Sequence, residues 1–166
     1  RHRMMDVLAQ VPGHAEFWRN LPPGDGPLLV VLGDSSAQGV GAVNPLDGWV
    51  GVVASHLREC HPDLGIRNIS LTGAKVAHVV NDQLPVLRSL GERPWQVICA
   101  IGSNDVALLD RPLDRFDASG FASGIEAIAA AMPRGSVFVE VPYFGTIPHQ
   151  SRVERSNRII HEVAER

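Results

Sequence analysis

Apolar runs alternate along this chain with longer segments in which apolar residues recur every three or four positions. The runs occupy residues 28–32, 66–71, 97–101 and 137–141. We interpret them as continuous rather than strictly alternating, which is typical of strands covered on both faces. The pattern therefore predicts four strands of a parallel sheet.

The segments between these runs have the length and spacing of helices. The sequence predicts helices over 45–60, 76–90, 116–132 and 151–166. Pro85 lies inside the second of them and must kink or divide it. Strand and helix thus alternate four times, which predicts an α/β fold with helices on both faces of the sheet.

The chain contains no repeat, low-complexity tract or long linker, so we expect a single domain over 1–166. Residues 1–27 form an N-terminal extension in this prediction. A helix from Asp6 to about Leu21 is expected there, interrupted by Pro12 and Gly13.

Composition and charge exclude several classes of function. The 15 Lys and Arg against 18 Asp and Glu give a net charge of −3 without a basic stripe, which argues against a nucleic-acid partner. No apolar stretch approaches the roughly 18–20 residues of a membrane span. No apolar signal-peptide core follows the basic start. We expect a cytoplasmic protein whose two cysteines, Cys60 and Cys99, are buried thiols.

Small and polar residues follow three of the predicted strands, and right-handed crossovers bring such loops to one edge of the sheet. Ser35 could present its hydroxyl and its own N–H to the same space, as a nucleophile requires, or be a turn serine or helix cap. Gly73 could offer its N–H to an oxyanion or simply form a turn. Asn104 could donate from a fixed side-chain amide or cap segment 105–110.

Together these residues resemble blocks I to III of the SGNH (GDSL-like) hydrolase superfamily. Gly33-Asp34-Ser35 matches the GDS block, Gly73 the glycine of block II, and Gly102-Ser103-Asn104-Asp105 the GxND signature. The resemblance implies a flavodoxin-like three-layer α/β/α sandwich with a parallel sheet. It also implies a serine esterase or lipase that needs neither a metal nor an organic cofactor.

The same resemblance implies roles for individual residues. Ser35 would form an acyl-enzyme with a small-molecule ester or thioester. The N–H groups of Ser35 and Gly73 and the side chain of Asn104 would form the oxyanion hole. Apart from the resemblance, Asp105 could orient Asn104, shape the rim of the site, or act as a cap.

One part of the family pattern does not occur. The family ends in an Asp-x-x-His block, and none of the seven histidines here follows an acidic residue by three positions. We expect that a C-terminal strand and this block are missing from the 166 residues; a degenerate enzyme is the alternative. We also expect the polypeptide alone to be nearly inactive, because a serine hydroxyl needs an adjacent base. His149 and His161 receive no role.

Two other functions stay open. The first is a non-catalytic domain of the same fold that binds an acyl or acetyl ligand. The second is a phosphate- or nucleotide-binding module built on the glycine-bearing loop 33–41, which lacks the Gly-Lys-Ser/Thr ending of a P-loop and leaves Asn104 unexplained. The sequence predicts neither the identity of the substrate nor the oligomeric state.

Overall fold

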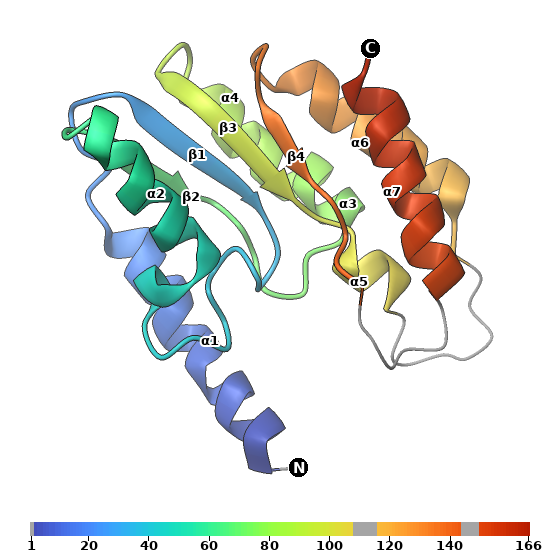
Figure 1. The fold of residues 1–166 in the computed structure, drawn as a ribbon, viewed down its shortest axis with the longest axis horizontal. Coiled ribbons are helices and arrows are strands. Elements are labelled where there is room, and N and C mark those ends of the chain that lie inside the picture. The colour runs from blue at the N-terminus through green and yellow to red at the C-terminus, as the bar shows by residue number, and fades with distance from the viewer. Residues whose placement is uncertain (1, 108–115, 144–149) are drawn as a thin grey trace.

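The computed structural model describes residues 2–107, 116–143 and 150–166 of the chain. Its strands form one parallel sheet in the order β2-β1-β3-β4 (Figure 1). The strands are β1 (Leu28–Gly33), β2 (Gly65–Asn68), β3 (Pro94–Ala100) and β4 (Val137–Val139). The predicted parallel α/β architecture is confirmed.

Helices lie on both sides of this sheet. Two pack against one face: α1 (His2–Asn20) and α2 (Trp49–Cys60). The apolar cluster on the other face includes residues of α3 (Val76–His78), the π-turn η2 (Val79–Gln83), α4 (Leu84–Ser89), α5 (Ser103–Val106), α6 (Ala118–Ala131) and α7 (Gln150–Ala164). A short 3-10 helix, η1 (Pro45–Asp47), precedes α2.

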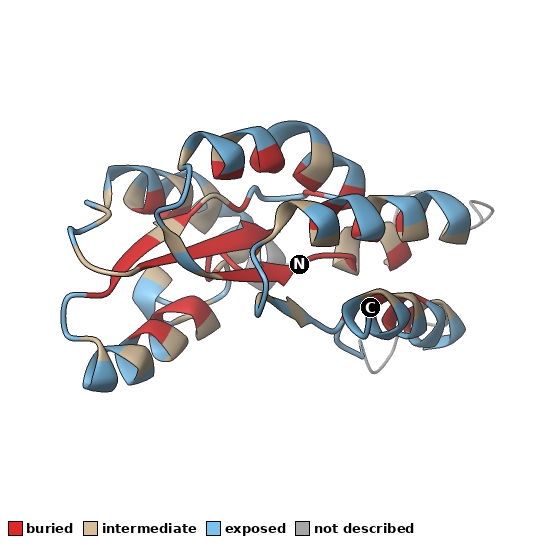
Figure 2. Cartoon of the chain, turned by 90° about the horizontal axis from the view of Figure 1, so that it is seen from above, coloured by how far each residue is buried: buried red, intermediate tan, exposed pale blue. Residues whose placement is uncertain are grey.

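Strand β1 lies at the centre of the core. Its successive side chains point to opposite faces, so Leu28 and Val30 belong to the cluster with α6, whereas Leu29 and Val31 belong to the cluster with α1 and α2. Figure 2 shows the buried residues concentrated in the sheet between the helical layers. This is the predicted three-layer arrangement.

Strand β2 ends earlier than the predicted run 66–71. The Asn68 side chain accepts hydrogen bonds from the backbone N–H and the hydroxyl of Ser70, which turns the chain at the strand end. Leu71 N nevertheless still donates to Gly33 O at 3.1 Å. The segment after β2 therefore stays attached to the end of β1.

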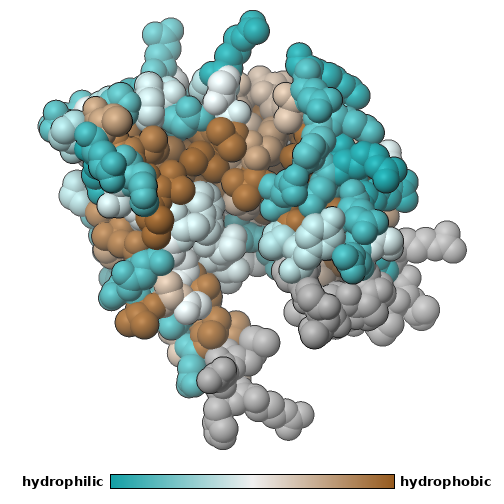
Figure 3. All heavy atoms as spheres, in the orientation of Figure 1, coloured by the Kyte–Doolittle hydropathy of each residue, from teal (hydrophilic) through white to brown (hydrophobic). Residues whose placement is uncertain are grey.

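The prediction that the fourth run is covered on both faces is wrong. Val137 and Val139 remain 46% and 38% exposed, whereas Phe138 packs against the cluster with α6. The reason is that the apolar cluster with α1 and α2 includes residues of β2 and β1 and Ile98 of β3, but none of β4. Figure 3 shows apolar side chains at the surface between α2 and α7, over β3 and β4.

The helices also depart from prediction in detail. The predicted helix 45–60 divides at Gly48 into η1 and α2. The predicted helix 76–90 contains the π-turn directly before Pro85, which agrees with a break at that proline.

Helix α1, by contrast, runs unbroken through Pro12. Proline removes the hydrogen bond to the carbonyl of Leu8, and Leu8 is exposed, so water can replace the lost donor.

Cys60 is exposed at the end of α2, which contradicts its predicted burial, whereas Cys99 is buried in β3. The helix carries Cys60 to its last position, beyond the part that packs on the sheet. Among the described helices, none combines the length and the apolar character needed to cross a membrane.

Candidate functional site

The chain turns directly after β1, and Ser35 lies in this turn. One helical turn is closed by the backbone bonds Gln38 N to Asp34 O, Gly39 N to Ser36 O and Val40 N to Ser35 O, at 3.3, 3.1 and 3.1 Å. The Asp34 carboxylate accepts the N–H of Ser36 at 2.9 Å. The capping role that the sequence left open for Ser35 therefore belongs to Asp34.

Ser35 itself is only partly buried. Within the described residues, neither its backbone N–H nor its hydroxyl has a hydrogen-bond partner in the protein. Both groups therefore remain able to bind a ligand.

Gly73 lies in the turn after β2 with φ +76°, a backbone conformation that favours glycine. Its Cα faces open space, because a Cβ added there would meet no atom within 4 Å. Among the described residues its N–H has no acceptor. Gly73 is thus a turn glycine, and it also presents a free donor.

Asn104 connects the two loops. It is the second residue of α5, whose N-cap is Gly102, so Asn104 is not the cap that the sequence left open. Its side-chain Nδ2 donates to Ala74 O at 2.9 Å and to Asp34 Oδ2 at 3.4 Å. The amide therefore lies between the neighbour of Gly73 and the neighbour of Ser35.

Asp105 binds the segment after β2, two residues beyond the contact that Asn104 makes with Ala74. Its Oδ2 accepts the N–H of Val76, the first residue of α3, at 3.1 Å. Burial raises the pKa of Asp105 to about 6, although this hydrogen bond and the charges of Lys75 and His78 act in the opposite direction. Asp105 thus acts as a cap for α3, one of the roles left open for it.

Gln83 is a residue of this region that the sequence analysis missed. It is 1% exposed and lies in the π-turn, where its Nε2 donates to Gly33 O at 2.8 Å and its Oε1 accepts Gly33 N–H at 2.9 Å. The sequence signal that could have identified it is a polar side chain at a core-facing position of the predicted helix, between Asp82 and Leu84. The side chain fixes the backbone at the end of β1.

Burial raises the pKa values of two groups beside the turn, Asp34 and Cys99. Burial raises the pKa of Asp34, and the hydrogen bonds from Ser36 only partly oppose this. Burial and the nearby Asp34 carboxylate together raise the pKa of the Cys99 thiol. Cys99 therefore stays protonated, since a reactive cysteine requires the thiolate.

Among the described residues no histidine contacts Ser35. His161, in α7, is exposed and pairs with Glu140, which directly follows β4. His149 lies outside the described residues, as do residues 108–110 of the segment 105–110.

The loop 33–41 does not form an open cradle for a phosphate. Several of its N–H groups are used within the protein, including those of Ser36, Gly39 and Gly41. The Asp34 carboxylate is buried at its start. A phosphate would meet a negative charge there, which disfavours the nucleotide-binding alternative.

Comparison with known proteins gives a family match. The model of the GDSL-like lipase/acylhydrolase family matches residues 31–166. No curated protein sequence matches the chain.

Solved structures share the fold. An alpha/beta hydrolase from the metagenome of Lake Arreo, Spain, is 22% identical with a TM-score of 0.66, over 86% of this chain and 74% of that chain. A variant of Axe2, an acetyl xylan esterase from Geobacillus stearothermophilus, is 20% identical with a TM-score of 0.65, over 86% and 73%. A lipase/acylhydrolase from Enterococcus faecalis is 20% identical with a TM-score of 0.61, over 83% and 71%.

Proposed function

Because this chain belongs to the GDSL-like lipase/acylhydrolase family, a family of ester hydrolases, we propose that it cleaves carboxylic ester or thioester bonds through an acyl-enzyme on Ser35. The observation that carries the proposal is the pair of Asn104 hydrogen bonds to Asp34 and Ala74. They hold a side-chain donor between Asp34 and Ala74, the sequence neighbours of Ser35 and Gly73. The backbone N–H groups of Ser35 and Gly73 have no acceptor among the described residues.

In the proposed reaction the Ser35 hydroxyl oxygen attacks the ester carbonyl carbon and loses its proton to a base. The carbonyl electron pair moves to oxygen, and the N–H groups of Ser35, Gly73 and Asn104 stabilise the resulting anion. Collapse of this intermediate expels the alcohol, or the thiol of a thioester, which takes up a proton. Water then hydrolyses the acyl group from Ser35.

The two bonds of Asn104 have different parts in this mechanism. The bond to Ala74 O is the shorter one and keeps the amide oriented. The contact with Asp34, at 3.4 Å, is long for a hydrogen bond. The oxyanion would take over this second N–H from the Asp34 carboxylate.

The base is the part of the mechanism that the described residues do not supply. None of the seven histidines follows an acidic residue by three positions. We propose that the 166-residue polypeptide alone therefore hydrolyses esters slowly, and that free imidazole accelerates it by accepting the proton of Ser35.

The test is covalent labelling with a fluorophosphonate, followed by mass spectrometry, and hydrolysis of p-nitrophenyl esters of increasing acyl length. We expect labelling of Ser35, stimulation of both reactions by imidazole, and a preference for acetyl or other short acyl groups. Ser89→Ala, which removes an exposed hydroxyl of α4, is the matched control for Ser35→Ala. Ester binding without labelling or turnover, even with imidazole, would indicate the non-catalytic acyl-binding alternative.

A further inference from the structure

We propose that α1, which precedes the family match at residues 31–166, positions the turn that carries Ser35. It does so through Gln10, His14 and Trp18, which we call the α1 polar face. The inference rests on the proposed function of Ser35. Figure 1 shows α1 passing alongside the loop that follows β1.

The residues of the α1 polar face are spaced four positions apart, so they lie along one side of the helix. Trp18 Nε1 donates to Gln38 O at 2.9 Å, and His14 Nδ1 lies 3.2 Å from the same oxygen. Since a carbonyl only accepts, this His14 nitrogen carries the hydrogen. One turn closer to the N-terminus of the helix, Gln10 Oε1 accepts the N–H of Gly41 at 2.9 Å.

These contacts satisfy groups that the Ser35 turn leaves without partners. A helical turn ends in carbonyls that have no donor of their own. Here Ala37 O receives the Asn68 side chain at 2.7 Å, and Gln38 O receives Trp18 and His14. Because these side chains are buried, water cannot easily replace them, and the turn depends on α1 for its closed form.

The side chain of Gln38 extends the connection to the other half of the site. Its Nε2 donates to Ser70 O at 2.9 Å, and its Oε1 accepts the Thr72 hydroxyl. Thr72 directly precedes Gly73. A residue fixed by α1 thus links the turn of Ser35 with the turn of Gly73, and α1 sets how the two N–H donors lie relative to each other.

The test compares two identical substitutions in one apolar cluster. Trp18→Phe removes the N–H donor and keeps an aromatic ring. Trp49→Phe makes the same change in α2, where the indole packs on the same cluster without a hydrogen bond to the described residues. Both variants of the 166-residue chain are examined by deuterium exchange of the peptide covering 36–41, by thermal unfolding, and by imidazole-assisted ester hydrolysis.

Trp18→Phe should speed exchange in 36–41 about tenfold, the effect expected for one lost hydrogen bond to a buried acceptor, and lower kcat by a similar factor at unchanged KM. Trp49→Phe should leave the exchange and kcat at their wild-type values, even if it lowers the melting temperature. A Trp18→Phe protein with wild-type exchange in 36–41 would overturn the inference. Equal effects of the two variants would do so as well.

The exchange result decides the role of α1 in holding the turn whether or not the chain hydrolyses esters. If exchange responds to Trp18→Phe while wild type neither labels nor hydrolyses, the proposed function fails and the attachment of the turn to α1 stands. If wild type hydrolyses esters and kcat does not respond to Trp18→Phe, the proposed function stands and the positioning role of α1 is refuted.

Discussion

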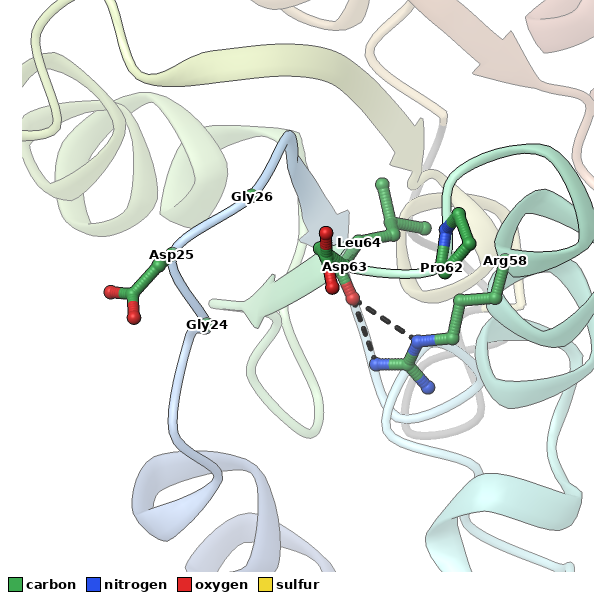
Figure 4. Close-up of a pocket in the computed structure, with 7 residues that line it drawn as sticks. All are labelled: Gly24, Asp25, Gly26, Arg58, Pro62, Asp63 and Leu64. Carbon is green, nitrogen blue, oxygen red and sulfur yellow. Dashed lines mark hydrogen bonds between the residues drawn. The ribbon is translucent and has the colours of Figure 1, made fainter.

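The two ends of the parallel sheet differ in how their polar groups are used. At the carboxyl end, the buried side chains of Asp34 and Gln38 are bonded to the backbone of the loops, and that of Gln83 to the last residue of β1. At the amino end a cavity of about 590 Å³ lies among Gly24, Asp25, Gly26, Arg58, Pro62, Asp63 and Leu64 (Figure 4).

The charged side chains that line the amino-end cavity are not arranged to bind a common ligand. Arg58 is exposed, and two of its guanidinium nitrogens already donate to Leu64 O at 3.1 and 3.0 Å. Figure 4 shows the Asp25 side chain pointing away from Arg58. The comparison teaches that unpaired N–H donors, held in place by a buried polar network, indicate the candidate site better than the volume of a cavity does.

The largest expected effect comes from the nucleophile. Ser35→Ala should reduce fluorophosphonate labelling to background, because no oxygen remains to attack phosphorus. Arg58→Ala, at the other end of the sheet, should label at the wild-type rate. Labelling is followed by mass spectrometry of the intact protein. A Ser35→Ala protein that still reacts at one site would move the nucleophile elsewhere.

Loss of the side-chain donor should have the next largest effect. Asn104→Ala is expected to lower kcat for imidazole-assisted ester hydrolysis by roughly 100- to 1,000-fold, as for other oxyanion-hole amides. Asn81→Ala changes an exposed asparagine of η2 and serves as the control. Steady-state kinetics on both variants provide the measurement. A decrease of less than about threefold for Asn104→Ala would remove this residue from the mechanism.

The buried network predicts a large difference between two glutamines. Gln83→Leu leaves the N–H of Gly33 without a partner and should lower the free energy of unfolding by about 2–3 kcal/mol. Gln96→Leu at the amino end removes an exposed hydrogen bond to Gly135 O and should lower the free energy of unfolding by less than about 1 kcal/mol. Urea denaturation measures both. Similar decreases in the free energy of unfolding for the two variants would contradict the described difference between the two ends of the sheet.

A smaller effect is expected from pH. The pKa of Asp105 is raised to about 6, so between about pH 4 and 6 the folded chain holds a proton that the unfolded chain releases. The free energy of unfolding should therefore fall by about 1–2 kcal/mol as pH rises through this window. In Asp105→Asn, whose amide oxygen can still accept Val76 N–H, this component should disappear.

The pH dependence is measured by urea denaturation at several pH values. Asp63→Asn, an exposed aspartate at the amino end, is the control. An unchanged pH profile in Asp105→Asn would contradict the assignment of this component to Asp105.

Some of this structure could be predicted because it depends on local pattern. The run 28–32 became a fully buried strand, and the loop residues Ser35, Gly73 and Asn104 follow their strands as the alternation required. The family resemblance was confirmed over residues 31–166. The roles of these three residues stay predictions.

Other features depend on tertiary contacts that no local pattern contains. Gln83 occupies a core-facing position of the helical pattern, but its bonds to Gly33 join segments 50 residues apart. The bond of Trp18 to the Ser35 turn joins segments 20 residues apart. The exposure of Val137 depends on which part of the sheet α1 and α2 cover. Periodicity identifies the elements, but it does not specify which side chain bonds to which loop.

The most direct measurement is a crystal structure of the chain after a fluorophosphonate has reacted to completion in the presence of imidazole. We predict phosphorus bonded to Ser35 Oγ, with its non-bridging oxygen within about 3.2 Å of Ser35 N, Gly73 N and Asn104 Nδ2. An adduct on another residue, or an oxygen directed away from Gly73 and Asn104, would contradict the proposed oxyanion hole.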